Sequence, residues 1–165
     1  MDDLVRIVIQ WAHILSGILW IGGGFYTVFV QLPALASMPP PARGPALAAI
    51  GPRQIRYILR VAELTIATGI LQVIVNPHIQ ELTLSRWSVA IGAGLVLALV
   101  IYGLIRGVIQ PAIERLLTLG PQAAAGDGAA AAQVGVLRER IQRVGYVQIT
   151  LGALIVLGMV TARFS

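Results

Sequence analysis

Apolar residues gather in four long runs along this sequence, and polar residues fall between the runs rather than alternating within them. A helix needs roughly 20 apolar residues to cross a hydrocarbon layer about 30 Å thick. Strands are excluded because no run alternates with a period of two and each is longer than a strand. The sequence therefore predicts an all-α protein, a bundle of four transmembrane helices at residues 5–30, 55–75, 87–109 and 144–160.

These predicted helices leave few residues outside the bilayer, so we expect a single membrane domain over residues 1–165. Residues 33–52 are rich in proline and alanine, which predicts a break after the first helix. Pro111 begins an amphipathic extension of the third helix, and Gly120–Ala132 is typical of a mobile linker. Residues 112–137 are therefore predicted to form a cytoplasmic loop. The acidic start of the chain predicts that the first helix is retained rather than cleaved as a signal peptide.

An internal repeat is visible when the second run is laid over the fourth. Ile58–Val61 matches Ile141–Val144 with an arginine in the same place, and Gly69 then matches Gly152 in the same register. The Gln-Leu-Pro-Ala that begins at Gln31 also resembles the Gln-Pro-Ala after the third run. Each unit contains two spans, so the sequence predicts two tandem αα-hairpin repeats with a pseudo-two-fold axis along the membrane normal. Chance similarity between apolar helices is the alternative.

Composition agrees with a lipid environment, since 57% of the residues are hydrophobic and only 12% are charged. The formal net charge of +5 comes from arginines at one set of helix ends, and the absence of cysteine excludes disulfides and thiolate metal sites. These arginines are Arg43, Arg53, Arg56, Arg60, Arg106, Arg115, Arg138, Arg140 and Arg143. By the positive-inside rule, both arginine-rich connections are cytoplasmic and both termini are extracytoplasmic. We expect this arrangement in the plasma (inner) membrane of a bacterium. The charge orients the protein and does not indicate nucleic-acid binding.

His13 is the most informative polar residue within a span, because a polar group in lipid is costly and tends to face the bundle interior. Gly17, Trp20 and Gly24 follow on the same helical face. Glycine there lets a neighbouring helix or a flat macrocycle approach the backbone. A neutral imidazole in this place is a suitable axial ligand for haem iron. The alternative is an ordinary hydrogen bond to another helix, since one histidine specifies no metal.

The segment Trp11–Phe25, with His13, Trp20 and the glycines Gly22–Gly24, resembles the first helix of the CopD/HemJ-type small four-helix integral membrane proteins. That group includes copper-resistance membrane domains, HemJ-like protoporphyrinogen oxidases and related families of unknown function. The resemblance implies that His13 binds b-type haem for redox chemistry or sensing. HemJ-like proteins also use a lysine in a later helix, and this sequence contains no lysine, which argues against protoporphyrinogen oxidation.

Further ligands are expected at the same end of the bundle. His78 follows the second helix and Met159 lies in the fourth, so the predicted topology places both in the outer half with His13. Either is a candidate second axial ligand, and together the three residues are a candidate copper site. Two copies of the chain could also each donate His13, which leaves a homo-oligomer or a membrane redox partner open.

In a second hypothesis, His13 binds no cofactor. Glu63 follows Arg60 by one helical turn, which predicts an intrahelical ion pair rather than a proton-carrying carboxylate. On this reading, the protein is a non-catalytic membrane subunit or a small-solute or copper carrier in which His13 is structural. The sequence does not decide whether the protein is an enzyme.

Overall fold

The computed structural model describes residues 3–75 and 86–163, which contain helices and turns and no strand. The elements are α1 (Asp3–Tyr26), η1 (Thr27–Gln31), α2 (Leu32–Ser37), α3 (Pro40–Ile74), α4 (Arg86–Leu104), η3 (Ile105–Ile109), α5 (Gln110–Ala124) and α6 (Gly128–Arg163). Within the described residues, four continuous helical segments are long and apolar enough to cross a membrane, at Asp3–Ser37, Pro41–Ile74, Trp87–Ala124 and Gly128–Thr161. The prediction of an all-helical, four-helix protein of multi-pass membrane type is confirmed.

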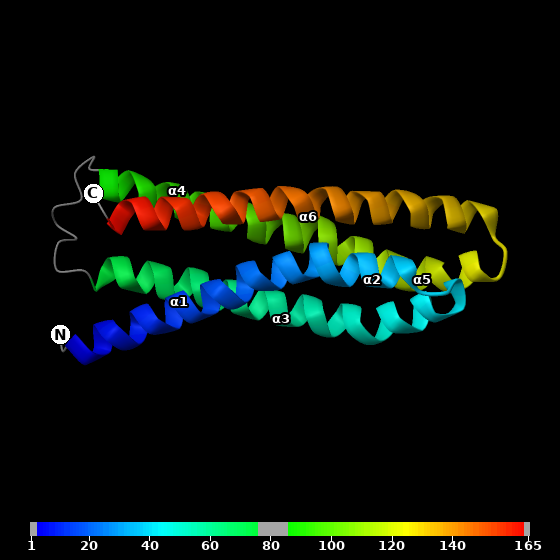
Figure 1. The fold of residues 1–165 in the computed structure, drawn as a ribbon, viewed down its shortest axis with the longest axis horizontal. Helices are drawn as coiled ribbons and strands as arrows, with labels where there is room; N and C mark the ends of the chain where they lie inside the picture. Colours follow the sequence, from blue (N-terminus) through cyan, green and yellow to red (C-terminus); the bar gives the residue numbers. More distant parts are fainter. Residues whose placement is uncertain (1–2, 76–85, 164–165) are drawn as a thin grey trace.

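The four long helices run side by side, and both chain ends lie at the same end of the bundle (Figure 1). α1 packs mainly on α3, and α4 packs mainly on α6, so consecutive helices form two hairpins. The hairpins contact each other through α1 with α6, α3 with α4 and α3 with α5. The two hairpin turns, at Met38–Pro39 and Ala125–Asp127, lie at the end opposite the termini.

The helices are longer than the apolar runs, so the expectation of few residues outside the bilayer is wrong. The four segments contain 34 to 38 residues, which corresponds to roughly 51–57 Å at 1.5 Å per residue. A hydrocarbon core is about 30 Å thick. The bundle therefore extends about 20 Å beyond it, and the surplus helix lies mainly at the arginine-rich end.

Residues 112–137 are mostly helical, and only Ala125–Asp127 form a turn. α5 agrees with the amphipathic extension predicted after Pro111, whereas the mobile linker expected over Gly120–Ala132 is wrong for most of its length. Alanine is the best helix former, so an alanine-rich tract continues a helix readily. The Oδ1 atom of Asp127 accepts the backbone N–H groups of Ala129 and Ala130 at 2.9 and 3.0 Å, which caps the start of α6.

The predicted break at residues 33–52 is also shorter in the structure. Only Met38 and Pro39 leave the helical conformation, with extended ψ angles of 149° and 140°. Pro33 lies in the first turn of α2, directly after the π-helical turn η1, and Pro40 opens α3. Proline is tolerated at both places because the first N–H groups of a helix have no intrahelical acceptor.

Two separate cores hold the bundle together. The first lies within the apolar runs of α1, α3, α4 and η3, and its buried residues are Trp20, Ile58, Leu59, Ala62, Ala98, Ile101 and Ile105. The second joins α5 to α6 at the arginine-rich end, and its buried residues are Ala112, Leu116, Leu119, Ala130, Val134 and Ile141. The second core explains why the extension after Pro111 packs as a helix instead of forming a loop.

Candidate functional site

His13 links α1 to α3. Its Nδ1 atom lies 2.9 Å from the backbone oxygen of Thr65 and 3.5 Å from the hydroxyl of Thr68. The imidazole lies against Gly69, where an added Cβ would meet its Cε1 atom at 2.8 Å. Because a backbone carbonyl only accepts, the contact with Thr65 fixes the proton on Nδ1. In the neutral ring the Nε2 atom then carries the lone pair, and no hydrogen bond to it occurs within the described residues.

The predicted face of α1 does point into the bundle, where protein side chains cover it. Trp20 is 3% exposed in the first core. An added Cβ at Gly17 would lie 3.7 Å from the Thr65 side chain, and one at Gly24 would lie 3.1 Å from the Gln148 amide. The structure therefore gives His13 a donor atom that fits an axial ligand, whereas the spaces beside these glycines serve helix packing.

The other predicted ligands lie apart from this place or outside the described residues. Met159 packs on α4, with its Cε atom 2.7 Å from a Cβ added at Gly94, whereas His13 packs on α3. His78 falls outside the described residues. Within residues 3–75 and 86–163, no group of three or more His, Asp or Glu side chains could hold a metal ion.

Glu63 makes the expected ion pair and a second contact. Its Oε2 atom lies 3.2 Å from Nη1 of Arg60, and its Oε1 atom accepts the hydroxyl of Tyr102 at 3.0 Å. The tyrosine comes from α4, so the carboxylate joins the two hairpins where α3 and α4 meet. These contacts give Glu63 a structural role in the described part of the chain.

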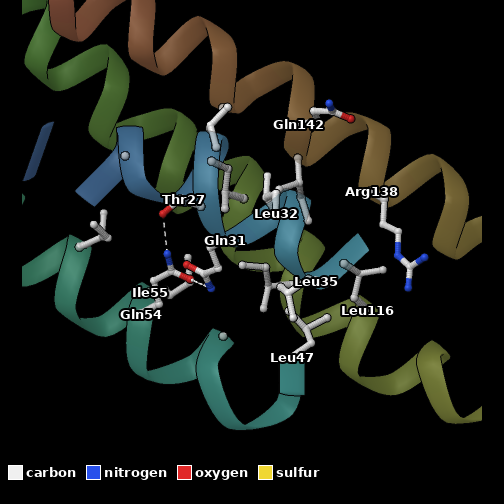
Figure 2. A pocket seen from close by; sticks show the side chains of 18 of the residues that line it. Thr27, Gln31, Leu32, Leu35, Leu47, Gln54, Ile55, Leu116, Arg138 and Gln142 are labelled. Atoms are coloured by element: carbon white, nitrogen blue, oxygen red, sulfur yellow. Dashed lines mark hydrogen bonds between the residues drawn. The ribbon is translucent and has the colours of Figure 1, made fainter. Parts of the chain in front are cut away.

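A hollow lies between helices of both hairpins, next to residues of both cores such as Ile58 and Leu116; Figure 2 shows some of the side chains that line it. Its volume is about 490 Å³, within the range of roughly 300–1,000 Å³ typical of small-molecule sites. All four long helical segments contribute side chains, most of them aliphatic. Gly24 lines the hollow, but His13, Gly17 and Trp20 do not. We call this hollow the central cavity.

A chain of hydrogen bonds forms one polar wall of the central cavity. The Nε2 atom of Gln31 donates to Oε1 of Gln54 at 2.6 Å, and Nε2 of Gln54 donates to the hydroxyl of Thr27 at 2.5 Å. The hydroxyl donates in turn to the backbone oxygen of Gly23 at 2.7 Å. Figure 2 shows the two amides and Thr27 together on one side of the cavity. The chain leaves Oε1 of Gln31 without a hydrogen bond in the described structure.

This chain of polar groups was not predicted as a site. Gln54 lies between the proline-rich segment 33–52 and the predicted second helix, and Thr27 is one of many hydroxyls in apolar helices. A usable signal does exist in the sequence, because Gln31 is an amide at the end of an otherwise apolar run. In the structure its side chain is buried, at 9% exposed. A buried amide needs a hydrogen-bond partner. Such a partner has to be sought on the neighbouring helix.

No family model matches this chain, and no curated protein or solved structure matches it. The likeness of Trp11–Phe25 to the CopD/HemJ-type proteins therefore depends on the residues of that segment alone. Any functional assignment has to come from the geometry of His13 and of the central cavity.

Proposed function

We propose that this is an integral protein of the plasma (inner) membrane, with both termini extracytoplasmic and the two hairpin turns cytoplasmic. The arginines support this orientation, because they gather on the helices at the end opposite the chain termini. Lipid contact is supported by the many large apolar side chains left exposed along α1, such as Ile7, Trp11 and Ile18.

We also propose that the two hairpins are tandem copies. Each has a π-helical turn, η1 or η3, directly before a helix that carries proline in its first turn. One pair of the predicted register, Ile58 and Ile141, shares its burial, at 7% and 8% exposed. Gly145, the partner of Ala62, is buried as well. A π turn is rare, so its occurrence at matching places argues against chance.

We infer that the protein binds a small, largely apolar solute in the central cavity and that His13 is structural. The observation that carries this inference is the cavity itself, a space of about 490 Å³ with one hydrogen-bonding wall. A few placed polar groups in a mostly apolar hollow are what small-molecule sites contain. His13, by contrast, already fills the space beside Gly69. This is the function of a carrier or binding subunit.

Leu35→Trp tests this function, because Leu35 is half-buried on the cavity wall of α2. In detergent, neutral apolar compounds of moderate size are expected to raise the melting temperature of the wild type by several degrees. The variant is expected to lose this shift because the indole fills the hollow. Leu64→Trp, on an exposed part of α3, is the matched control and keeps the shift. Equal shifts in all three proteins, or none in the wild type, would contradict the proposal.

A second candidate function is haem b binding through His13, favoured by the unpaired Nε2 atom. A ligating histidine typically donates its other ring N–H to a carbonyl, as His13 does to Thr65. Haem held there would supply one-electron redox chemistry. On this candidate, protein purified with haem supplied shows a Soret band that is lost in His13→Ala. His78→Ala tests the predicted second axial ligand: the band is unchanged if His13 alone holds the iron and is altered if His78 is the second ligand. A wild type that stays colourless after reconstitution rules this candidate out.

A further inference from the structure

The central cavity has a mouth between α2 and α6. Most of its lining residues are buried or half-buried, and the exposed ones fall on these two helices alone among the residues described around it. They are Pro33, Ala36, Arg138, Gln142 and Tyr146. α2 packs on η1 and α3, while α6 packs on α1, α4 and α5, so the two helices face each other without an extensive contact. A ligand can therefore reach the cavity sideways.

The mouth runs from an aromatic edge to a cationic one. On the side of the apolar runs, the ring of Tyr146 meets Phe29 edge-on, with centroids 6.4 Å apart. Eight residues earlier on α6 stands Arg138, roughly 12 Å farther along the helix axis. In the proposed orientation, the aromatic pair lies at the level of the acyl chains and Arg138 at the level of the lipid head groups. The mouth therefore spans the boundary between hydrocarbon and water.

The arginines at the cationic edge have no acidic partner among the residues that line the cavity. The Arg138 guanidinium makes no hydrogen bond or ion pair with the described part of the chain, and Figure 2 shows it at the edge of the cavity, away from the Thr27 end. Arg43 also lines the cavity and uses only its Nε atom, which donates to the backbone oxygen of Met38 at 2.7 Å. Guanidinium groups suit carboxylate and phosphate partners.

We propose that the central cavity takes up a single-chain amphiphile with an anionic head group from the inner leaflet, with the head group on Arg138 and Arg43. A fatty acid and a lysophospholipid share this chemistry. The acyl chain enters between α2 and α6 and lies among the aliphatic residues of the interior, such as Ile58, Ile105 and Ile109. This proposal rests on the proposed function and names its ligand.

Arg138→Gln tests the head-group contact. The full-length protein is held in nanodiscs of a neutral phospholipid, and binding of a fluorescent C16 fatty acid, a C16 lysophosphatidic acid and a C16 alcohol is measured for each variant. The wild type is expected to bind the two acids more tightly than the alcohol. Arg138→Gln is expected to weaken both acids about three- to fivefold, the size typical of an exposed ion pair, and to leave the alcohol unchanged. A larger loss for one acid identifies which head group is preferred.

Two further variants keep the test specific. Arg140→Gln removes an exposed arginine of the same helix that does not line the cavity, and its affinities are expected to stay within twofold of the wild type. Arg138→Lys keeps the charge and is expected to retain most of the affinity for the acids. Equal effects of Arg138→Gln and Arg140→Gln, or equal binding of acid and alcohol by the wild type, would overturn the head-group assignment while leaving the cavity as a solute site. If no probe and no neutral compound binds at all, the proposed function itself fails.

Discussion

Gly145→Leu is expected to lower the apparent melting temperature of the detergent-solubilised protein by roughly 6–12 °C, equivalent to about 3 kcal/mol. Gly145 is buried on α6 where this helix meets η1, and an added Cβ would lie 2.8 Å from Cγ2 of Val28. Val28 is 6% exposed, and a β-branched side chain has little rotamer freedom in a helix. The clash therefore has to be relieved by moving the helices apart. Thermal unfolding followed by size-exclusion chromatography measures the loss.

Gly135→Leu is the matched control on the same helix. Gly135 is exposed, and nothing lies within 4 Å of a Cβ added there. Leucine also has a higher helix propensity than glycine, so this variant is expected to be as stable as the wild type or slightly more stable. If Gly145→Leu had the same melting temperature as Gly135→Leu, the close approach of α6 to η1 would be wrong.

Gly69→Leu is expected to have the second large effect, a loss of about 1–3 kcal/mol that His13→Ala partly reverses. An added Cβ at Gly69 would lie 2.8 Å from Cε1 of the His13 ring, so the new side chain has to displace the imidazole from its contact with Thr65. Removing the ring gives the leucine the vacated space between α1 and α3. The double variant is therefore expected to melt at a higher temperature than Gly69→Leu alone.

The double-mutant cycle separates this coupling from a general effect of leucine in the membrane. Gly92→Leu on α4 is the control, because Gly92 is exposed and has open space around its Cα. His13→Ala is expected to be no more stabilising in the Gly92→Leu background than in the wild type. Additive losses from His13→Ala and Gly69→Leu would show that the ring does not occupy the space beside Gly69.

The membrane-spanning part of the fold could be predicted from the sequence because lipid imposes a simple rule. Every backbone polar group has to be satisfied within the helix, so a long apolar run identifies a span without knowledge of its neighbours. The paired Arg60 and Glu63 were predictable for the same reason, since residues one turn apart on a helix meet whatever surrounds them.

The arginine-rich end could not be predicted in this way, because water permits both loop and helix there. Proline and alanine are typical of an irregular segment, yet Pro33 and Pro40 lie at helix starts, where proline is favourable. The sequence does hold a local signal for the early start of α6, namely Asp127 as an N-cap before the alanines. Leu116 and Leu119 pack on α6, and this contact stabilises the helical form of both α5 and the start of α6.

Only the part of the candidate site that lies on a single helix could be predicted from the sequence. The spacing of His13 and Trp20 correctly places both on the inward face of α1, but it cannot show that α3 already uses the imidazole. The central cavity depends on four helices that leave a gap next to residues of both cores. Gln31 and Gln54 are 23 residues apart in sequence and meet only in the folded hairpin.

The surplus length of the helices affects how the protein responds to bilayer thickness. A helix that matches the hydrocarbon in length has to tilt, or deform the lipid around it, when the thickness changes. α6 instead continues without interruption from Gly128 to Arg163, so the lipid boundary can shift along it while the helix stays in place. In the proposed orientation, a thicker membrane submerges more of the opening toward Arg138, and a thinner one exposes more of it to water.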